Sequence, residues 1–346
     1  MTDTENQDNN PSMARIFSGI QPTGIATLGN YLGAIRNWVA LQDGNDECVF
    51  CLVDMHAITV FQDPTALREQ TRQMAAVLLA CGINPERSIL FHQSAVSAHA
   101  RLAWIFNCVA RIGWLNRMTQ FKDKAGKDRE AVSTGLYVYP NLMAADIHAY
   151  HATKVPVGDD QLQHLELAND IAEKFNHDFS AAFFPRIEPL VLKESARVMS
   201  LRDGAKKMSK SDPSDQSRIN LTDDADMIAT KIRRAKTDSA PLPEHVNDLA
   251  ERPEARNLLG IYATITGQTP QEVLHQFAGS GFGSFKEKLA EALIAHLEPI
   301  GAKTRDYLTD PATLDQILQA GAHRAAAIAE PIVTEAERLV GFLARG

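Results

Sequence analysis

Residues 19–35 read GIQPTGIATLGNYLGAI and hold four glycines, one proline and two threonines. The β-rich run RIFSGI leads into it from residue 15, and the helix-like run NYLGAIRNWVALQ leads out of it to residue 42. A glycine-rich turn between a strand and a helix exposes main-chain N–H groups at the positive end of the helix, which suits a phosphate or another anion. The spacing is not GxGxxG, so the stretch is not a dinucleotide fingerprint, and a plain tight turn explains it equally well.

Small residues continue into the expected helix. Gly29 and Gly33 would let a flat ring lie close to the helix, and Thr27 and Asn30 offer small hydrogen-bonding side chains. These features suit an anionic ligand with a flat ring, but the turn alone does not identify it.

Strand-like and helix-like runs alternate from residue 14 to about residue 200. We expect strands at 14–19, 48–54 and 88–92, and helices near 29–42, 65–81 and 98–116. This order predicts βαβ units and a parallel sheet covered on both faces. After about residue 215 the strand pattern fades while apolar residues keep a helical spacing. The fold class is therefore α/β, followed by an all-α bundle.

Composition limits the class of protein. The 346 residues carry 35 lysines and arginines against 43 acidic residues, a net charge of −8, and 45% are apolar. No apolar run approaches the ~20 residues of a membrane span, so no membrane partner is expected. Residues 1–12 are polar and lack arginine, unlike a secretory or transit peptide. We expect a disordered tail there and a cytoplasmic protein.

The cysteines Cys48 and Cys51 form a CxxC, which invites a redox or metal interpretation. Their surroundings, ECVFCLVDMHAITV, are apolar and β-rich, and no second CxxC follows. Buried thiols in a central strand fit this context better.

Three stretches are locally basic despite the net negative charge, and local charge decides contacts with nucleic acid. Residues 111–129 carry six basic and two acidic residues, 201–210 carry four and one, and 231–236 carry four and none. The first stretch is also explained as a solvated face or loop. The last is also explained as a helix C-terminus that complements its dipole, after a start at 222–224.

The second motif is KKMSKS at residues 206–211. Lys207 and Lys210 lie three apart among small polar residues on an expected loop, so they form a mobile pair of compact cations. Such a pair suits a leaving group with several negative charges, such as pyrophosphate. A chance lysine pair is common on surface loops, but a full KMSKS downstream of a glycine-rich turn is not.

Together, GIQPTGIATLGNYLGA and KMSKS resemble the class I aminoacyl-tRNA synthetases and, more narrowly, the bacterial tryptophanyl-tRNA synthetases. The resemblance covers nearly the whole chain from Met13 and includes VDMHAIT, RMTQFKDK, YPNLMAADI and VPVGDDQLQH. The general class I motif has histidine at its first and fourth places, where this chain has Thr27 and Asn30. The tryptophanyl branch typically has this threonine and asparagine.

The resemblance implies a two-step reaction. The carboxylate of tryptophan attacks the α-phosphate of ATP, and the acyl group of the adenylate then moves to tRNA(Trp). Because the substrate supplies its own nucleophile, catalysis consists of alignment and charge stabilisation. Mg²⁺ would be carried by ATP, and no resident metal is expected.

The resemblance also assigns residues to the ATP site. Lys207 and Lys210 would hold the leaving phosphates, Lys124 would reach them from the other side, and Thr27 and Asn30 complete the catalytic set. The nucleotide would be lined by Gln21, Pro22, Thr23, Gly29, Asn30, Gly158, Asp159, Asp160, Val198, Lys207, Met208, Ser209, Lys210 and Ser211. For residues 157–161 alone, a turn with a helix N-cap is an equally good explanation.

Selection of tryptophan has a physical basis in residues 139–146. Pro140 suits the first turn of a helix, with Tyr139 at its mouth, and Tyr139, Met143 and Asp146 then share one face. The indole N–H can only donate, and an ionised Asp146 would accept it, whereas phenylalanine would leave the carboxylate unpaired. The alternative is a partly exposed aspartate paired with a nearby Lys or His.

The remaining residues of the tryptophan site follow from the resemblance. His56 would pack beside the indole, although a satisfied core histidine is the usual role for such a residue. The full set is Asp146, Tyr139, Met143, His56, Phe17 and Gln161.

The resemblance implies domains and partners as well. Membership of that family would imply that the protein forms a homodimer. Arg233, Arg234 and Lys236 are candidate contacts to the phosphates of the tRNA. The expected parts are a tail (1–12), a Rossmann-like catalytic domain (13–215), a helical anticodon-binding domain (216–310) and a C-terminal helix that packs back on the catalytic domain (311–346).

Three alternatives stay open. A tyrosyl-tRNA synthetase shares the fold but recognises a phenol. A nucleotidylyl transferase acting on a small metabolite could use the same turn, but it would not need the helical domain. A non-catalytic tRNA-binding paralogue could have lost Lys124, Lys207 or Lys210, yet all three are present.

Overall fold

A computed structural model describes residues 14–118, 132–158, 161–190 and 197–344. Its centre is a five-stranded parallel sheet in the order β3-β2-β1-β4-β5. The strands are β1 (Arg15–Ile20), β2 (Glu47–Leu52), β3 (Ile89–His92), β4 (Lys154–Pro156) and β5 (Glu188–Leu190). Chain order reverses between β1 and β4, which gives a Rossmann-like sheet and confirms the expected fold class.

The expected elements are found with small shifts, and the short strands β4 and β5 are additional. The helix expected at 29–42 is continuous but includes a π-helical turn, η1 (Tyr31–Ile35), between α1 (Leu28–Asn30) and α2 (Arg36–Leu41). The helix expected at 98–116 is two helices. The others before β4 are α3 (Asp54–Ala57), α4 (Pro64–Ala80), α5 (Ala98–Val109), α6 (Ile112–Leu115) and α8 (Thr134–His148).

Strand side chains alternate between two apolar cores, one on each face of the sheet. Ile16 and Phe50 face the core that α2 and α4 cover, and this core continues into the C-terminal helices. Phe17 and Val49 face the core that α5, α8 and α9 (Leu162–Asp178) cover. Burial on both faces explains why the strands read as continuous apolar runs.

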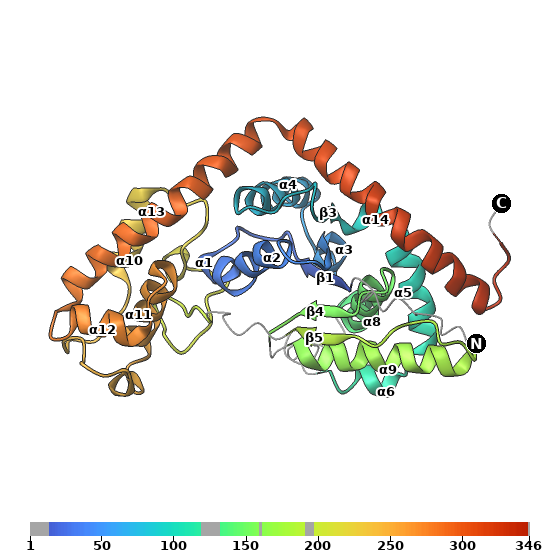
Figure 1. Ribbon diagram of the computed structural model, residues 1–346, viewed down its shortest axis with the longest axis horizontal. Coiled ribbons are helices and arrows are strands. Elements are labelled where there is room, and N and C mark those ends of the chain that lie inside the picture. Colours follow the sequence, from blue (N-terminus) through green and yellow to red (C-terminus); the bar gives the residue numbers. More distant parts are fainter. Residues whose placement is uncertain (1–13, 119–131, 159–160, 191–196, 345–346) are drawn as a thin grey trace, which may run out of the picture.

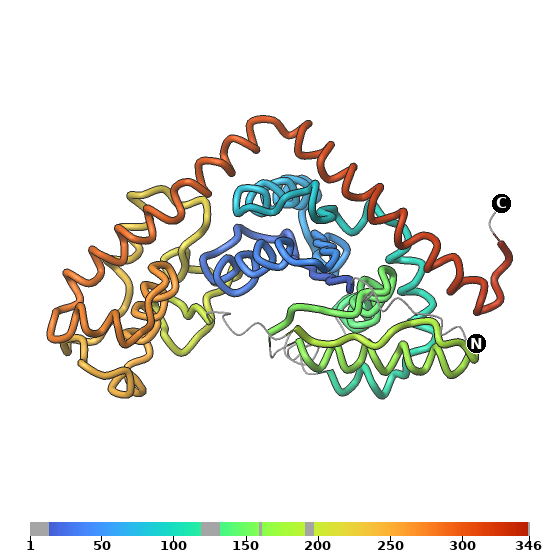
Figure 2. The backbone as a smooth tube through the Cα atoms, in the orientation of Figure 1, coloured from blue at the N-terminus to red at the C-terminus, as the bar shows by residue number. Residues whose placement is uncertain are grey.

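No strand follows β5 in the described chain, and the regular elements there are helices, as expected. They are α10 (Ala225–Arg234), α11 (Pro253–Thr266), α12 (Pro270–Phe277), α13 (Phe282–Thr309) and α14 (Pro311–Leu339). The long helices α13 and α14 form an inverted V above the sheet (Figure 1). In the tube view, α13 runs beside α10, and α14 descends beside α5 (Figure 2).

Helix α14 lies directly on the edge of the sheet at β3. A Cβ atom added to Gly321 would lie 1.8 Å from the main-chain oxygen of Leu90. The glycine is therefore required for the contact between α14 and the sheet. Helix α13 contacts α4, so the two C-terminal helices contact the sheet-containing part of the chain at two places.

The CxxC cysteines are buried thiols in β2. Cys48 and Cys51 are 1% and 0% exposed, and both are free. Burial raises the pKa of Cys48 to about 11 and raises the pKa of Cys51 well above its usual value. Neither thiol is suited to redox or metal chemistry.

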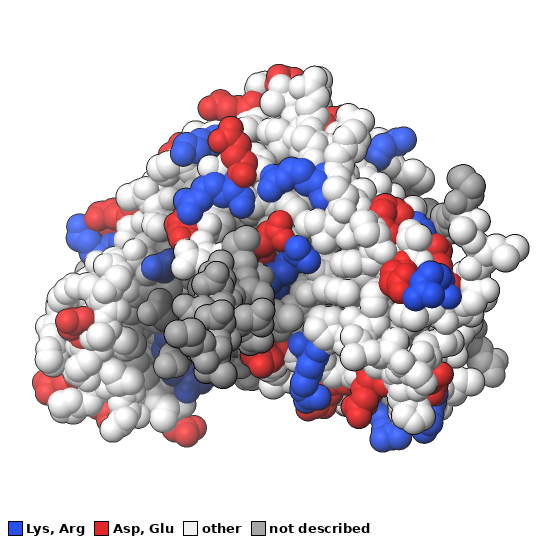
Figure 3. All heavy atoms as spheres, turned by 45° about the vertical axis from the view of Figure 1, so that its right-hand side comes forward, with Lys and Arg blue, Asp and Glu red and all other residues white. Residues whose placement is uncertain are grey.

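Other features of the described residues bear on partners. None of their helices is long and apolar enough to cross a bilayer. No group of three or more His, Cys, Asp or Glu side chains among them is placed to hold a metal ion. Charges of both signs are interspersed over the face in Figure 3.

Candidate functional site

The site lies at the carboxyl ends of β1 and β4, where chain order reverses. Open α/β sheets bind ligands at this point because the loops on its two sides diverge and leave a crevice. The loop after β1 starts with Gln21, Pro22 and Thr23, and the loop after β4 leads to Gly158. The sequence-predicted nucleotide residues on these two loops are thus neighbours through the pairing of β1 with β4.

The turn after β1 ends in a capping box. The side-chain oxygen of Asn30 accepts hydrogen bonds from the main-chain N–H of Thr27 (2.9 Å) and from its hydroxyl (3.0 Å). The Thr27 hydroxyl in turn accepts from the N–H of Asn30, and Thr27 is 1% exposed. The Thr27 hydroxyl is therefore used within the turn. The side-chain nitrogen of Asn30, Nδ2, makes no hydrogen bond within the described part of the chain.

The loop that carries KMSKS packs against this turn. The ammonium group of Lys210 donates a hydrogen bond to the main-chain oxygen of Gln21 at 3.1 Å. A Cβ atom on Gly29 would lie 3.5 Å from the Cβ of Met208, so the start of α1 is in contact with the loop. The structure thus brings together the two motifs that the sequence analysis singled out.

The start of the loop is held by a short antiparallel pairing. The N–H of Met208 donates to the oxygen of Val198 (3.0 Å), and the N–H of Ser200 donates to the oxygen of Lys206 (2.8 Å). The side chain of Met208 is buried, while Lys207 and Ser209 are exposed. The Ser209 and Ser211 hydroxyls lie 3.0 Å apart.

The two lysines of the motif differ from most lysines on this fold in lacking an acidic partner in the part of the chain that the structure describes. Within the described residues, neither Lys207 nor Lys210 forms an ion pair. Partial burial lowers the pKa of the Lys210 ammonium to about 8. A desolvated cation next to a main-chain oxygen gains strongly from an incoming anion.

The end of the loop is anchored by a buried ion-pair cluster. Lys231 of α10 is 2% exposed, and its ammonium lies 2.6 Å from a carboxylate oxygen of Asp223 and 2.7 Å from one of Asp215. The next segment pairs with the turn after β1, because Leu28 N–H donates to Ile219 and Leu221 N–H donates to Ala26, both at 2.8 Å.

This cluster changes the interpretation of the basic stretch at 231–236. Lys231 is buried in the cluster, and Lys236 pairs with Glu254 at 2.7 Å. Arg233 and Arg234 are exposed, and no ion pair joins either to another described residue. The predicted start at 222–224 is correct, because Asp224 caps α10 through the N–H of Met227.

Asp146 is the centre of a second cluster, on α8. Its Oδ1 accepts from Gln93 Nε2 at 2.6 Å and from His99 Nδ1 at 2.7 Å, and its Oδ2 accepts from His56 Nε2 at 2.7 Å. Asp146 is 2% exposed, so the alternative of a partly exposed aspartate is wrong, although its pairing with histidine is right. Burial opposes ionisation, but His56 and His99 outweigh it and lower the pKa of Asp146.

Aromatic side chains surround this carboxylate. The Tyr139 hydroxyl lies 2.7 Å from His164 Nε2, and the rings of Tyr139 and His56 meet edge to face at 6.2 Å. Phe17 of β1 stacks on Tyr150 at 5.6 Å. The predicted tryptophan residues Asp146, Tyr139, His56 and Phe17 therefore belong to one connected cluster, which reaches Phe17 of β1 through His99 and Tyr150.

The two other predicted tryptophan residues lie on α8 and just before α9. Met143 is half-buried on α8 and packs against the same core. Gln161 precedes α9, is half-buried, and donates its N–H to the oxygen of Gly158 at 3.0 Å.

The prediction for Pro140 is wrong. Ser133 caps α8 by accepting a hydrogen bond from the N–H of Leu136, and Pro140 lies inside the helix. Proline is tolerated there although it has no N–H to donate, so the helix loses one hydrogen bond. Tyr139 therefore projects from the body of α8 and not from its mouth.

Three predicted ATP-site residues lie outside the described residues. They are Lys124, Asp159 and Asp160.

Three residues of the Asp146 cluster were not found by sequence reasoning: Gln93, His99 and Tyr150. Gln93 follows β3 directly, as Asp54 and His56 follow β2, and adjacent parallel strands end at the same edge. That placement was a usable signal for Gln93. His99 and Tyr150 lie among apolar residues and read as ordinary core positions.

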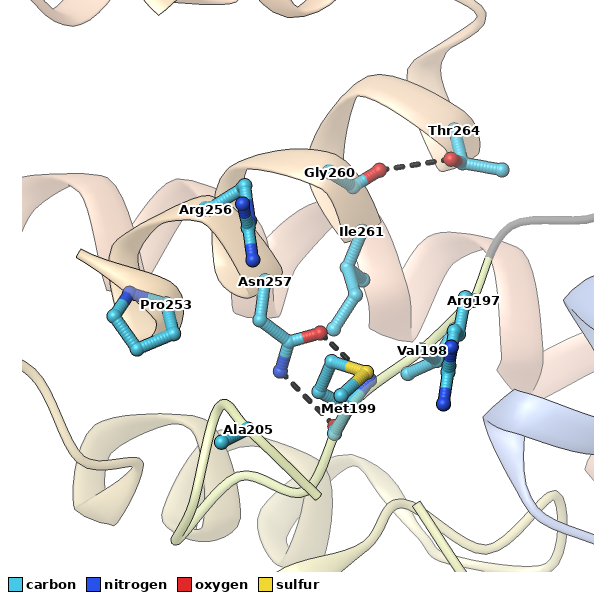
Figure 4. Close-up of a pocket in the computed structure, with 10 residues that line it drawn as sticks. All are labelled: Arg197, Val198, Met199, Ala205, Pro253, Arg256, Asn257, Gly260, Ile261 and Thr264. Carbon is cyan, nitrogen blue, oxygen red and sulfur yellow. Dashed lines mark hydrogen bonds between the residues drawn. The ribbon is translucent and has the colours of Figure 1, made fainter. Parts of the chain in front are cut away.

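A cavity of about 460 Å³ lies between α11 and the segment before the KMSKS loop. Asn257 of α11 accepts from the N–H of Met199 (2.9 Å) and donates to its oxygen (3.0 Å), as Figure 4 shows. Arg197 and Arg256 also line the cavity, without a carboxylate among the lining residues. Of the predicted nucleotide residues, only Val198 lines it.

Comparisons with known proteins agree with this geometry. The family described as tRNA synthetases class I (W and Y) matches residues 9–298. The tryptophan–tRNA ligase of Caulobacter vibrioides is 57% identical over 329 residues, covering 95% of each chain.

Two solved structures give the same picture. The tryptophanyl-tRNA synthetase of Mycoplasma pneumoniae has a TM-score of 0.85 at 30% identity, over 96% of this chain and 98% of that one. The Campylobacter jejuni enzyme complexed with ADP and tryptophan has a TM-score of 0.80 at 32% identity, over 95% and 100%.

Proposed function

The chain belongs to the class I tRNA synthetases of the tryptophan and tyrosine group, and we propose that it activates L-tryptophan with ATP and transfers the acyl group to tRNA(Trp). The observation that carries the proposal is the hydrogen bond between Lys210 and the main-chain oxygen of Gln21. It supports the proposal because it joins Lys210 of the KMSKS loop to the turn after β1, at the end of the sheet where open α/β folds bind nucleotides.

In this proposal the lysines act on the leaving group. Lys207 and Lys210 stabilise the negative charge that develops on pyrophosphate, with Lys124 on the other side of the phosphates. Their ammonium groups are free to move toward that charge because neither is held by a carboxylate within the described residues. Charge stabilisation of this kind is a large term in phosphoryl chemistry.

The turn and neighbouring loops hold the nucleotide. Gln21, Pro22, Thr23, Gly29 and Asn30 line one side. Thr27 acts by holding the Oδ1 of Asn30, which leaves the side-chain nitrogen Nδ2 available to the nucleotide. The other assigned residues are Gly158, Asp159, Asp160, Val198, Met208, Ser209 and Ser211. Mg²⁺ enters with ATP, bound to its phosphates.

Asp146 selects tryptophan in this proposal. Two donors satisfy Oδ1 and one satisfies Oδ2, so an ionised carboxylate with about four acceptor positions keeps one on Oδ2. The indole N–H supplies the missing donor, and phenylalanine cannot. Tyr139, Met143, His56, Phe17 and Gln161 form the rest of the pocket.

Family membership also supports the proposed partners. Arg233 and Arg234 remain exposed for tRNA phosphates, while Lys236 must first leave Glu254. We infer a homodimer, a cytoplasmic location and anticodon binding by residues 216–310.

ATP–pyrophosphate exchange tests the proposal. Purified protein is assayed with tryptophan, tyrosine and phenylalanine in parallel, and aminoacylation is measured on tRNA(Trp) and tRNA(Tyr) transcripts. We expect exchange and aminoacylation with tryptophan and tRNA(Trp) only. Exchange with tyrosine and none with tryptophan would overturn the choice of substrate.

A variant tests the role of Asp146. Asp146→Asn keeps the shape of the side chain but removes its charge, so the preference for tryptophan over phenylalanine should fall by about tenfold or more. Asp178→Asn, an exposed aspartate at the end of α9, is the control. An unchanged preference in Asp146→Asn would contradict the assignment.

A further inference from the structure

We propose that His99 and Tyr150 are positioning residues for tryptophan selection: Tyr150 fixes the proton of His99 on Nδ1, and that N–H orients Asp146. The inference rests on the proposed function and extends it beyond the residues that would touch tryptophan.

The three side chains form an unbroken buried chain. The Tyr150 hydroxyl lies 2.8 Å from His99 Nε2, and His99 Nδ1 lies 2.7 Å from Asp146 Oδ1. Tyr150 and His99 are 0% exposed, and Asp146 is 2% exposed. Water therefore does not compete for these hydrogen bonds, and each group depends on its neighbour.

The direction of the hydrogen bonds follows from the chemistry of the end groups. Burial raises the pKa of the Tyr150 phenol, so the phenol keeps its proton, and among the described residues His99 Nε2 is the group within reach that can accept it. A neutral imidazole that accepts at Nε2 carries its proton on Nδ1 and donates there. The proton on Nδ1 faces Asp146, which is the polarity that an ionised carboxylate needs.

In the other hydrogen bonds of Asp146, too, the neighbouring side chain is the donor and the carboxylate is the acceptor. Gln93 accepts the N–H of Met55 at its Oε1 (3.1 Å), which fixes its amide so that Nε2 faces Asp146. His56 faces Oδ2 through Nε2. The chain of hydrogen bonds from Tyr150 through His99 to Asp146 is called the relay below. The N–H of His99 and the amide of Gln93 together occupy Oδ1 fully, and they leave the open acceptor position on Oδ2.

Removal of the Tyr150 hydroxyl would loosen this arrangement. Without a donor at Nε2, that buried nitrogen has no hydrogen-bond partner, and Asp146 alone still holds the ring of His99. The ring of His99 can then shift, or the carboxylate of Asp146 can rotate with it. Either change weakens the bond to an indole N–H without removing any group from the substrate pocket.

Tyr150→Phe tests the relay in the intact protein. The substrates are tryptophan and its isostere β-(3-benzothienyl)alanine, in which sulfur replaces the indole N–H, and kcat and KM are measured by pyrophosphate exchange. We expect the preference for tryptophan over the isostere to fall by about tenfold, through KM, with kcat little changed. Conversely, Tyr150→Phe with an unchanged preference would overturn the relay.

The matched control is Phe91→Leu. The Phe91 ring packs on both His99 and Tyr150, at 5.8 and 6.0 Å, but it makes no hydrogen bond to them. A packing defect alone should lower the stability of the protein and leave the preference for tryptophan intact. An equal loss of preference in Phe91→Leu would show that Tyr150 acts only through packing.

A measurement on the wild-type protein keeps the inference testable if Tyr150→Phe does not fold. Nitrogen-15 NMR of the imidazole distinguishes the two neutral tautomers and the imidazolium. We expect His99 to be protonated on Nδ1 and unprotonated on Nε2. A proton on Nε2 would contradict the relay, whereas a wild-type protein without tryptophan-dependent exchange would instead contradict the proposed function.

Discussion

The ammonium nitrogen of Lys210 lies 3.1 Å from the main-chain oxygen of Gln21, although 189 residues separate them in the sequence. One residue belongs to the loop that carries KMSKS, and the other begins the turn after β1. The contact holds a cation at the carboxyl end of the central strand without neutralising it. An anionic ligand can therefore replace a weak main-chain contact with a strong ionic one.

The first prediction concerns the pH dependence of ATP binding. The pKa of Lys210 is lowered to about 8, so its ammonium is present below this pH and is lost above it. Bound phosphates favour the ammonium, so binding of ATP should take up protons near pH 8 and weaken as pH rises further. Calorimetry in buffers of different ionisation enthalpy measures this uptake.

Lys210→Arg is the control for this effect, because a guanidinium stays protonated over the whole range. Its proton uptake near pH 8 should vanish. An undiminished uptake in Lys210→Arg would assign the titration to another group.

The second prediction concerns the contact between α14 and the sheet. Gly321→Ala places a Cβ atom against the main chain of Leu90, which cannot move without shifting β3. We expect a loss of about 3 kcal/mol or more in the free energy of unfolding, measured with urea.

Gly260→Ala is the matched control in the body of α11, where a Cβ atom would meet nothing within 4 Å. This change should stabilise the protein by about 0.5–1 kcal/mol, because alanine is the better helix former. Similar destabilisation at both glycines would refute the role of Gly321.

Much of this arrangement could be predicted from the sequence, because glycine turns and apolar periodicity are local signals. The turn at 19–35, the first three strands and the KMSKS loop all follow from such patterns. Pro140 was misplaced because a proline suits the first turn of a helix, and the alternative cap at Ser133 was overlooked. The partners of Asp146 come from the ends of β2 and β3 and from α5. No local sequence pattern predicts that these distant residues are in contact.

The third prediction concerns the cluster that anchors the KMSKS loop. Lys231→Met leaves the buried carboxylate of Asp223 without its cation, which should cost about 3–5 kcal/mol of unfolding free energy. The double variant Lys231→Met with Asp223→Asn should recover a large part of that loss, since no buried charge is left unpaired and the N–H of Asn220 keeps an acceptor. Additive losses in a double-mutant cycle would show that the two side chains are not coupled.

The fourth prediction concerns the thiols. Cys108 is exposed, whereas Cys48, Cys51 and Cys81 have a raised pKa caused by burial. In the native protein, iodoacetamide should therefore label Cys108 quickly and the other three only after unfolding. Peptide mapping by mass spectrometry identifies the labelled residues. Fast native labelling of Cys48 or Cys51 would restore the redox or metal interpretation of the CxxC.

The most direct test of the leaving-group role compares chemistry with binding in Lys210→Ala. Single-turnover adenylate formation and equilibrium tryptophan binding are measured for wild type, for Lys210→Ala and for Lys288→Ala, an exposed lysine on α13 that serves as control. We predict that Lys210→Ala slows adenylate formation by about 100-fold or more while tryptophan binding changes less than about threefold. Equal losses in adenylate formation and tryptophan binding would contradict the role of Lys210 in stabilising the leaving group.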